Sequence, residues 1–308
     1  MAFNALATAT IFQTTLDQIA TQEALTGWME ANAGQVIYNG GAEVKIPKIN
    51  MDGMADYDRD AGYTQGGVTL TFGTYTMTQD RGRKFQLDAM DVNENNFVTT
   101  GATVMGEFQR TKVIPEIDAY RLSKCITLAI AKNAVEYGYT PAVGSMLSKI
   151  KKGIKQIREN GYNGELVIHI NFDSLEILEE EIGGKITRDN FTVGGIDTRV
   201  PFVDGCPLIG TPSNRMYSAI TLNDGKSSGQ TAGGYKKASS ALDCNFIIMP
   251  RTSPIAVSKQ DKMKIFTPDQ NQDADAWKMN YRRFHDLWVP ENKQDSLYAC
   301  IKDAKPGV

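Results

Sequence analysis

Two runs of alternating apolar and polar residues, separated by a stretch that cannot form a core, constrain the fold most. The first run spans residues 44–49, and the second spans residues 68–77, where Gly73 predicts a bulge or bend. Residues 50–67 between them contain four aspartates, one arginine and four glycines. This pattern predicts a long two-stranded excursion with a polar, flexible tip. Because a two-stranded ribbon is only marginally stable alone in water, it should need a partner surface.

The return of this excursion to the body carries a cluster of charges. Residues 80–83 read Asp-Arg-Gly-Arg, and the residues on either side, 74–77 and 84–87, have strand character. Arginine followed by glycine at the centre predicts a tight turn between two strands.

Helical spacing of apolar residues recurs in four places. A weakly structured arm over residues 1–15 is followed by a short helix that begins at Thr15 and ends near Gly34. A long helix is predicted from Asn93 to Ile114, with a kink or restart at Pro115 and a continuation to Ala131. Two further helices are predicted over residues 145–160 and 172–182, and short strands over 165–170, 191–211, 244–249, 255–258, 263–266, 283–289 and 296–301. The mixture indicates an α+β fold.

Composition excludes several classes of protein. The 308 residues carry a formal net charge of −3, whereas a dedicated nucleic-acid-binding protein usually has a strong basic excess. The four cysteines are far apart, so we expect buried free thiols rather than a zinc site or a disulfide framework. No signal peptide and no membrane-spanning segment is visible, and we expect the protein to fold in the cytosol, without a membrane partner.

A catalytic set is not apparent either. A Gly-Lys-Ser fragment at Gly225 lacks the earlier glycine of a phosphate-binding loop. His169 lies in an apolar strand and reads as a core residue, while His285 and its neighbour Asp286 should point to opposite faces of a strand. We therefore expect no enzyme, no cofactor and no metal ion. A hydrolase would require a pocket that gathers His169 or His285 with a nucleophile.

Two charged segments are candidates for binding. The helix over residues 145–160 has a basic face that could contact the phosphates of DNA non-specifically or line the inner face of an assembly, although a solvated face or a partner for the acidic helix 172–182 is the simpler interpretation. That face is formed by Lys149, Lys151, Lys152, Lys155 and Arg158. The excursion and its return carry the candidate contacts between subunits: Asp52, Asp56, Asp58, Arg59, Asp60, Asp80, Arg81, Arg83 and Lys84.

The order of these elements, and three stretches of sequence, resemble the major capsid proteins of tailed bacteriophages that have the Hong Kong 97 fold. The stretches are TYTMTQDRGRKFQLDAMDVNENN, GGYKKASSALDCNFIIMPRTSPIAVSK and KIFTPDQNQDADAWKMNYRRFHDLWVPENKQDSLYACI. The resemblance implies an N-terminal arm and short helix (1–41), an extended β-hairpin loop with its return (42–90) and a peripheral domain with a long spine helix (91–164). It also implies an axial domain (165–280) and C-terminal strands that return to the peripheral domain (281–308).

The resemblance further implies a function. The chain would assemble into pentamers and hexamers of an icosahedral shell that encloses double-stranded DNA in the virion, after assembly in the host cytoplasm. Its partners would be itself, a portal and a separate scaffolding protein, because the sequence begins without the long charged segment that some relatives have. A nanocompartment shell of the encapsulin type and another virion component, such as a tail tube protein, are the alternatives. The charges at residues 80–84 would pair with acidic residues of a neighbouring subunit, in particular with those in the excursion of that neighbour.

Overall fold

The computed structural model describes residues 24–35, 37–38, 43–60, 62–88, 105–183, 187–193 and 196–306. Its helical segments are η1 (Gly27–Gln35), the π-helical η2 (Gln109–Val113), α4 (Ile114–Ala131), α5 (Met146–Glu159), α6 (Phe172–Ile182), η3 (Ser213–Arg215), η4 (Pro268–Gln270) and η5 (Glu291–Ser296). The first strands are β1 (Ile37–Tyr38), β2 (Glu43–Met51), β3 (Val68–Thr76), β4 (Gln79–Asp88), β5 (Val135–Glu136), β6 (Leu166–Asn171), β7 (Thr187–Val193) and β8 (Ile196–Val203). The remaining strands are β9 (Cys206–Thr211), β10 (Ile220–Leu222), β11 (Tyr235–Lys237), β12 (Cys244–Pro250), β13 (Ile255–Phe266), β14 (Ala276–Trp288) and β15 (Tyr298–Ile301).

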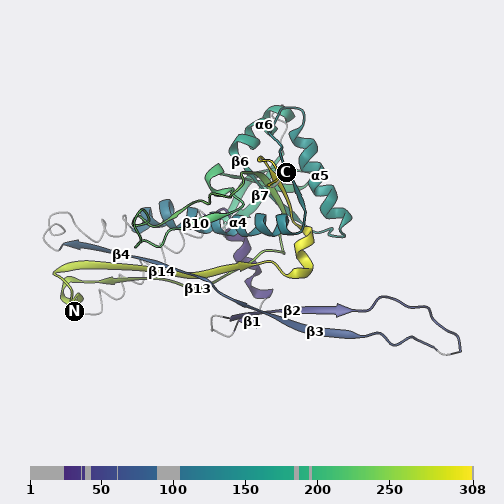
Figure 1. Cartoon of the computed structure of the whole chain (residues 1–308), viewed down its shortest axis with the longest axis horizontal. Helices are drawn as coiled ribbons and strands as arrows, with labels where there is room; N and C mark the ends of the chain where they lie inside the picture. Colours follow the sequence, from purple (N-terminus) through teal and green to yellow (C-terminus); the bar gives the residue numbers. More distant parts are fainter. Residues whose placement is uncertain are drawn as a thin grey trace.

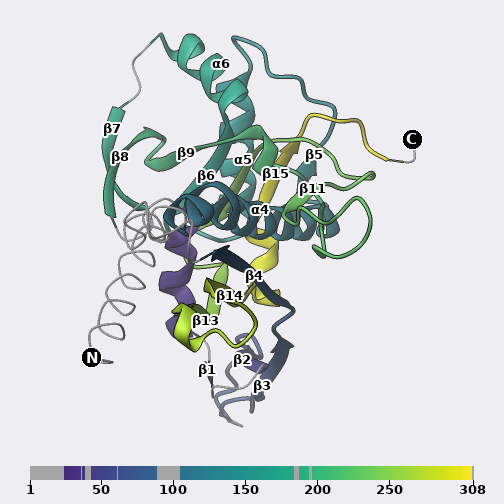
Figure 2. The ribbon, with the colours of Figure 1, turned by 90° about the vertical axis from the view of Figure 1, so that its left-hand side faces the viewer.

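A seven-stranded mixed sheet, in the order β5-β15-β12-β6-β9-β8-β7, forms the centre of the body. Its strands β6 and β12 are buried along their whole length, which agrees with their nearly continuous apolar sequence. Helix α4 lies across one face of this sheet, and α5 and α6 cover the other (Figures 1 and 2). The body is therefore a three-layer sandwich.

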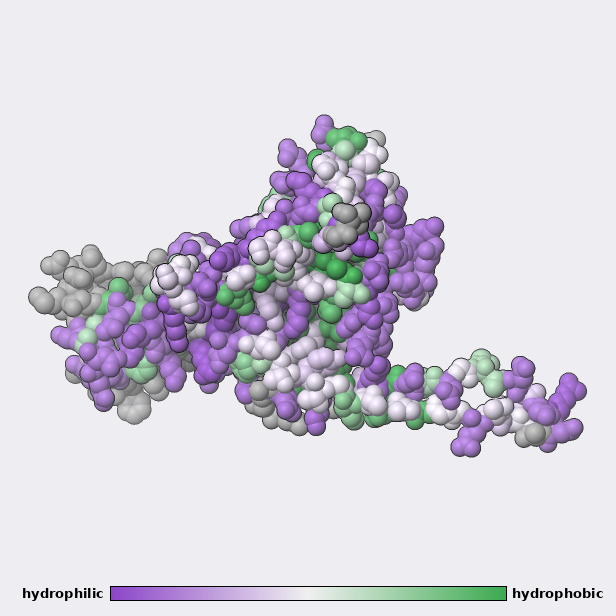
Figure 3. All heavy atoms as spheres, viewed as in Figure 1, coloured by the Kyte–Doolittle hydropathy of each residue, from purple (hydrophilic) through white to green (hydrophobic). Residues whose placement is uncertain are grey.

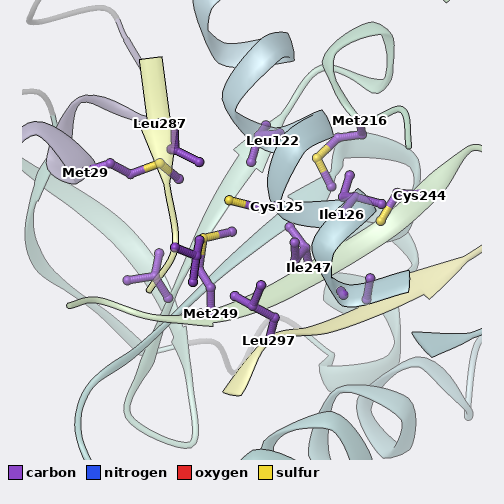
Figure 4. Packing of buried hydrophobic residues seen from close by; sticks show 14 of the residues in the cluster. Met29, Leu122, Cys125, Ile126, Met216, Cys244, Ile247, Met249, Leu287 and Leu297 are labelled. Atoms are coloured by element: carbon purple, nitrogen blue, oxygen red, sulfur yellow. The ribbon is translucent and has the colours of Figure 1, made fainter. Parts of the chain in front are cut away.

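Alternation along β6 divides its side chains between the two layers. Val167 joins the core under α4, whereas Ile168 and Ile170 join the core under α5 and α6. Figure 4 shows the first of these cores, in which Leu122 and Cys125 of α4 meet Ile247, Met249 and Leu297. Helix α5 belongs to the predicted peripheral segment 91–164, but it packs on strands of the predicted axial segment 165–280, so the second core contains residues of both segments.

The predicted domain limits stay a prediction.

The helices agree well with the sequence pattern. α5 and α6 match the predicted ranges to within one residue at each end. The side chain of Asn171 caps α6 by accepting a hydrogen bond from the Ser174 amide at 2.8 Å, and Gly183, with φ of 63°, ends the helix. The expected break at Pro115 takes the form of the π-helical turn η2, which directly precedes α4.

A three-stranded antiparallel sheet, β13-β14-β4, projects from the body. It corrects the predicted turn at residues 80–83: these residues lie within the continuous strand β4, and Gly82 pairs with Arg282 of β14. A Cβ atom on Gly82 would lie 2.6 Å from the carbonyl oxygen of Tyr281, so the glycine permits close strand contact instead of a turn. The two strands predicted over 255–258 and 263–266 are one strand, β13, with an irregular register between Ser258 and Gln260.

The predicted excursion is a two-stranded ribbon of β2 and β3, which extends away from the body in Figure 1. Its register is regular from Glu43 opposite Thr76 to Met51 opposite Val68, so the bulge predicted at Gly73 is wrong. The predicted arm (1–15), the helix start at Thr15 and the first turns of the long helix (93–104) lie outside the described residues.

Gly153 offers a test of the packing between α5 and the sheet. A Cβ atom there would lie 2.5 Å from the ring of Tyr298 and 2.8 Å from Ile248. We expect Gly153→Ala to lower the free energy of unfolding of the unassembled subunit by about 1–3 kcal/mol through overpacking. Urea denaturation followed by circular dichroism measures it. Gly34→Ala, where the new Cβ meets nothing within 4 Å, is the matched control. Equal stability of the two variants would contradict this packing.

Candidate functional site

Three polar side chains on successive turns of α4 connect the body to three other segments. Asp118 accepts hydrogen bonds from the backbone and hydroxyl of Thr26 and pairs with Arg215 at 2.9 Å. Arg121 pairs with Glu30 of η1 at 2.5 Å. Lys124 pairs with Asp286 of β14 at 2.6 Å. Their spacing of three residues puts them on one side of the helix, so α4 fixes η1, η3 and β14 at once.

Glu30 lies between two arginines. Arg121 is fully buried, and Arg283 approaches the same Glu30 oxygen at 2.8 Å while its other end pairs with Asp261 at 2.7 Å. Burial alone would raise the pKa of Glu30, but Arg121 and Arg283 more than offset it, and the pKa lies below its usual value. This carboxylate therefore contributes stability at neutral pH that is lost as the pH falls through its lowered pKa.

Strand β4 carries Asp80, Arg81, Arg83 and Lys84, for which the sequence predicted contact with a neighbouring subunit. The structure gives Asp80 and Arg81 ion-pair partners within the chain. Asp80 forms a bidentate pair with Arg282, at 2.5 and 2.8 Å. Arg81 pairs with Glu116 of α4 and also donates to the carbonyl oxygens of Asn223 and Gly234, at 3.1 and 3.3 Å. Arg81 thus joins the projecting sheet, α4 and the loop between β10 and β11.

The other two charges of this group remain more accessible. Arg83 is exposed and donates to the carbonyl oxygen of Thr231 at 3.1 Å, and Lys84 is exposed. Arg81 and Arg83 line a cleft of about 940 Å³ between β4, the start of α4 and the β10–β11 loop. We call this the basic cleft.

The ribbon has two chemically different faces, and the apolar one changes side along its length. Close to the body, Val44 and Ile46 point inward and are buried against Trp288. Beyond Ile46, the same face carries polar residues, including Lys48, which pairs with Glu291 at 2.7 Å. The opposite face becomes apolar and exposed there, with Pro47, Ile49 and Met51 on β2 across from Phe72, Leu70 and Val68 on β3.

The exposed face is extensive. The relative exposures are 60% for Ile49, 67% for Met51, 71% for Val68, 54% for Leu70 and 49% for Phe72. Figure 3 shows these hydrophobic residues along the shaft of the ribbon and hydrophilic residues at its far end. An apolar strip of this kind on a thin ribbon has no cover among the described residues and marks a surface for association.

The acidic tip of the ribbon is shaped by its own hydrogen bonds. Asp58 and Gly62 exchange backbone hydrogen bonds at 3.2 and 2.8 Å, and Asp58 also accepts from the amide of Asp60. Asp52 accepts from the amide of Gly67 at 2.7 Å. The tip therefore uses two of its four carboxylates to hold the turn. Asp56, Arg59 and Asp60, also predicted as contacts, are exposed.

The basic face of α5 is neutralised largely within the chain. Glu136 of β5 pairs with Lys149 and Lys152, the latter at 3.0 Å. Lys151 lies 3.9 Å from Asp204, Lys155 lies 3.5 Å from Glu159, and Arg158 donates to the carbonyl oxygens of Tyr162 and Gly164. Helix α6 contributes Glu181, which accepts from the first amides of α5. The cations of α5 thus pair mainly with β5 rather than with α6.

Both histidines are buried. His169 accepts a hydrogen bond from the indole nitrogen of Trp28 at 3.3 Å, and burial lowers its pKa to about 3. This confirms its prediction as a core residue. All four cysteines are free and buried, as predicted, and burial raises the pKa values of Cys125 and Cys300 to about 12.

Neither a cluster of metal-binding side chains nor a helix able to cross a membrane is present in the described part of the chain. No group of three or more His, Cys, Asp or Glu residues there could hold a metal ion. No described helix is long and apolar enough to cross a membrane.

Comparison with solved structures identifies the fold. One similar chain belongs to a structure described as the asymmetric unit of the bacteriophage PhiM1 mature capsid, with a TM-score of 0.55, 12% identity, and coverage of 86% of this chain and 83% of that one. Chains from Mycobacterium phage Adephagia (TM-score 0.56, 9% identity, 91% of each chain) and Mycobacterium phage Che8 (0.53, 12%, 86% of each) are similar too. No protein-family model and no curated protein matches the sequence. The predicted class, an α+β chain with a phage-capsid fold, is confirmed.

Arg81 and Arg83 provide a matched pair for testing the joint at β4. We expect Arg81→Met to lower the free energy of unfolding by about 1–3 kcal/mol, because it leaves the half-buried Glu116 and the carbonyl oxygen of Asn223 without this donor. Arg83→Met should cost less than about 0.5 kcal/mol, as for most exposed side chains. Thermal unfolding and hydrogen exchange of residues 223–234 measure both effects. Similar stability and exchange in the two variants would contradict the role of Arg81.

Proposed function

We propose that this chain is the major capsid protein of a tailed bacteriophage and that copies of it assemble into an icosahedral shell of pentamers and hexamers. The observation that carries the proposal is the change of apolar side along the ribbon. The inner face packs on the body of the same chain near the base, while the outer face exposes five large apolar side chains farther out. The likeness to a phage capsid chain, over most of both chains, supports the same role. The role is structural rather than catalytic.

The outer apolar face of the ribbon rests, in this proposal, on a neighbouring subunit. Since the face points away from the body that holds the ribbon, an intramolecular cover would require the ribbon to twist over. A neighbour removes this surface from water without such a change, and each buried CH₂ group contributes about 0.8 kcal/mol. The ribbon therefore supplies both reach and affinity in the shell.

The remaining partners follow from the function of a shell. We infer that a portal and a scaffolding protein accompany assembly, that the virion is the final location, and that the packaged double-stranded DNA is contacted without sequence specificity. The cations of α5 have short-range partners in the chain, so phosphate contact there would compete with existing pairs. A nanocompartment shell would have the same subunit fold, and the contents of purified particles, DNA or a cargo enzyme, separate the two functions.

Leu70 and Thr71 are neighbours on β3 that point to opposite faces of the ribbon. We expect the wild-type protein, expressed with its scaffold, to form closed particles in negative-stain images. Leu70→Glu should reduce particle yield at least about tenfold, because it places a charge in the apolar contact between subunits. Thr71→Glu adds the same charge on the other face and should assemble.

Circular dichroism and thermal unfolding of both unassembled variants control for folding. Normal particles from Leu70→Glu would rule out the outer face as the contact. A wild-type protein that stays monomeric with and without scaffold would contradict the function itself.

A further inference from the structure

The basic cleft has an unbalanced set of charges. Eight basic and three acidic residues line its 940 Å³. All three carboxylates are already engaged: Asp80 by Arg282, Glu116 by Arg81, and Asp224 by the hydroxyl and amide of Ser227 and the amide of Lys226. The hydrogen bond from the Ser227 hydroxyl, followed by those from the two amides, lowers the pKa of Asp224 to about 2, so this group stays ionised and offsets one of the positive charges of the cleft.

Only half of the eight basic residues that line the cleft form an ion pair with a carboxylate among the described residues. Arg81, Arg215, Lys237 and Arg283 each pair with a carboxylate of the chain. No ion-pair partner is present, within the described residues, for the other four, which are all exposed: Arg83, Lys112, Lys226 and Lys236. Arg83 comes from β4, Lys112 from η2, and Lys226 and Lys236 from the β10–β11 loop and β11. Three separate segments of the chain therefore direct positive charge toward one hollow.

A buried polar atom at the edge of this hollow also lacks a partner. His285 lines the cleft, is 4% exposed, and its Nδ1 makes no hydrogen bond to any described residue. Burial lowers the pKa of His285 well below its usual value, and nearby cations, Arg121 first among them, lower it further. Because four of the exposed cations that line the cleft have no ion-pair partner among the described residues, the cleft is suited to an anionic occupant.

The same chain presents an anionic segment. The tip of the ribbon, residues 52–60, carries four aspartates against Arg59. Asp52 and Asp58 hold the turn, which leaves the exposed carboxylates of Asp56 and Asp60 available. A tip that keeps its shape through backbone hydrogen bonds loses little conformational freedom when it binds.

Geometry decides which copy supplies the tip. In Figure 1 the ribbon extends to one side of the body, whereas β4 and β10, which flank the cleft, lie on the other side. A ribbon therefore cannot enter the cleft of its own chain. A contact between two different surfaces is heterologous, and it generates a closed ring when the rotation from one subunit to the next is a whole fraction of a full turn. Such a contact is what a pentamer or hexamer requires.

We propose that the acidic tip of one subunit's ribbon docks into the basic cleft of another subunit, with Asp56 and Asp60 facing Arg83, Lys112, Lys226 and Lys236. This inference rests on the proposed function and adds to it the surface of the neighbouring subunit that the tip of the ribbon contacts. The apolar face of the ribbon provides the area of contact, and the tip and cleft define its position along the neighbour.

Charge exchange tests the pairing. We expect the double substitution Asp56→Lys/Asp60→Lys to reduce particle yield at least about tenfold, and Lys226→Glu/Lys236→Glu to do the same, since like charges then meet at the contact. The combined fourfold variant should regain at least half of the wild-type yield. Lys132→Glu, a reversal of an exposed charge after the last residue of α4, at the opposite end of the helix from the cleft, is the control and should assemble normally.

Engineered cysteines locate the contact directly. The four native thiols are buried, so a variant with Asp60→Cys and Lys226→Cys has only two accessible thiols. Under mild oxidation of assembled particles, a heterologous contact links each subunit to two others and gives a ladder up to pentamers and hexamers on a non-reducing gel. Each single-cysteine variant should remain monomeric on the same gel.

The outcomes separate the inference from the function on which it depends. If the wild-type protein forms particles but both charge reversals assemble normally, or the double-cysteine variant gives no ladder, the tip does not occupy the cleft and the capsid function stands. If Lys226→Glu/Lys236→Glu assembles normally but binds a short DNA duplex at least about tenfold more weakly than wild type in fluorescence anisotropy, the cleft binds phosphate, and the inference is overturned.

Discussion

The fully buried guanidinium of Arg121 is the interaction on which the relative placement of the parts depends. It lies on the face of α4 that turns toward η1, and it holds Glu30, which Arg283 of β14 also contacts. A buried guanidinium carries a desolvation cost that its contacts with Glu30 and Thr26 offset, and removal of one partner of a buried pair typically costs about 3–5 kcal/mol. The network therefore favours the observed arrangement of α4, η1 and β14. The base of the ribbon is held by a separate contact with β14, the packing of Val44 and Ile46 against Trp288.

The ribbon illustrates how an element that is only marginally stable alone can be held by the rest of the chain. Val44 and Ile46 anchor its base in the core beside Trp288, and the change of apolar side beyond Ile46 prevents the distal half from folding back onto the same surface. The distal half then exposes its apolar face until another surface covers it. Because β3 is regular through Gly73, this change of side comes from the residue pattern alone: the apolar positions move from even to odd on β2 without a bulge.

Local pattern was sufficient to predict the elements but not their long-range partners. The limits of α5 and α6, the buried His169 and the paired strands of the ribbon follow from periodicity and capping. The turn predicted at Asp80–Arg83 failed because Arg-Gly was interpreted locally, whereas Gly82 makes room for the backbone of β14. A glycine inside a strand pattern could have signalled this close approach. The partners of Arg81, on α4 and on the β10–β11 loop, are 35 to 153 residues away in sequence, and no spacing rule reaches them.

The apolar shaft and the charged tip of the ribbon contribute differently to the contact with a neighbour, and this difference has a physical basis. Hydrophobic contact is strong but non-directional, so a flat apolar face could slide along a neighbour with little change in free energy. Charge complementarity at the tip contributes less affinity but penalises every wrong register, because a displaced tip leaves carboxylates opposite apolar or acidic groups. One short segment of 16 residues between β2 and β3, polar and rich in aspartate and glycine, is enough to add that selectivity to a contact whose strength comes from elsewhere. A subunit built in this way can tolerate variation in the shaft of the ribbon more readily than a change of sign at its end.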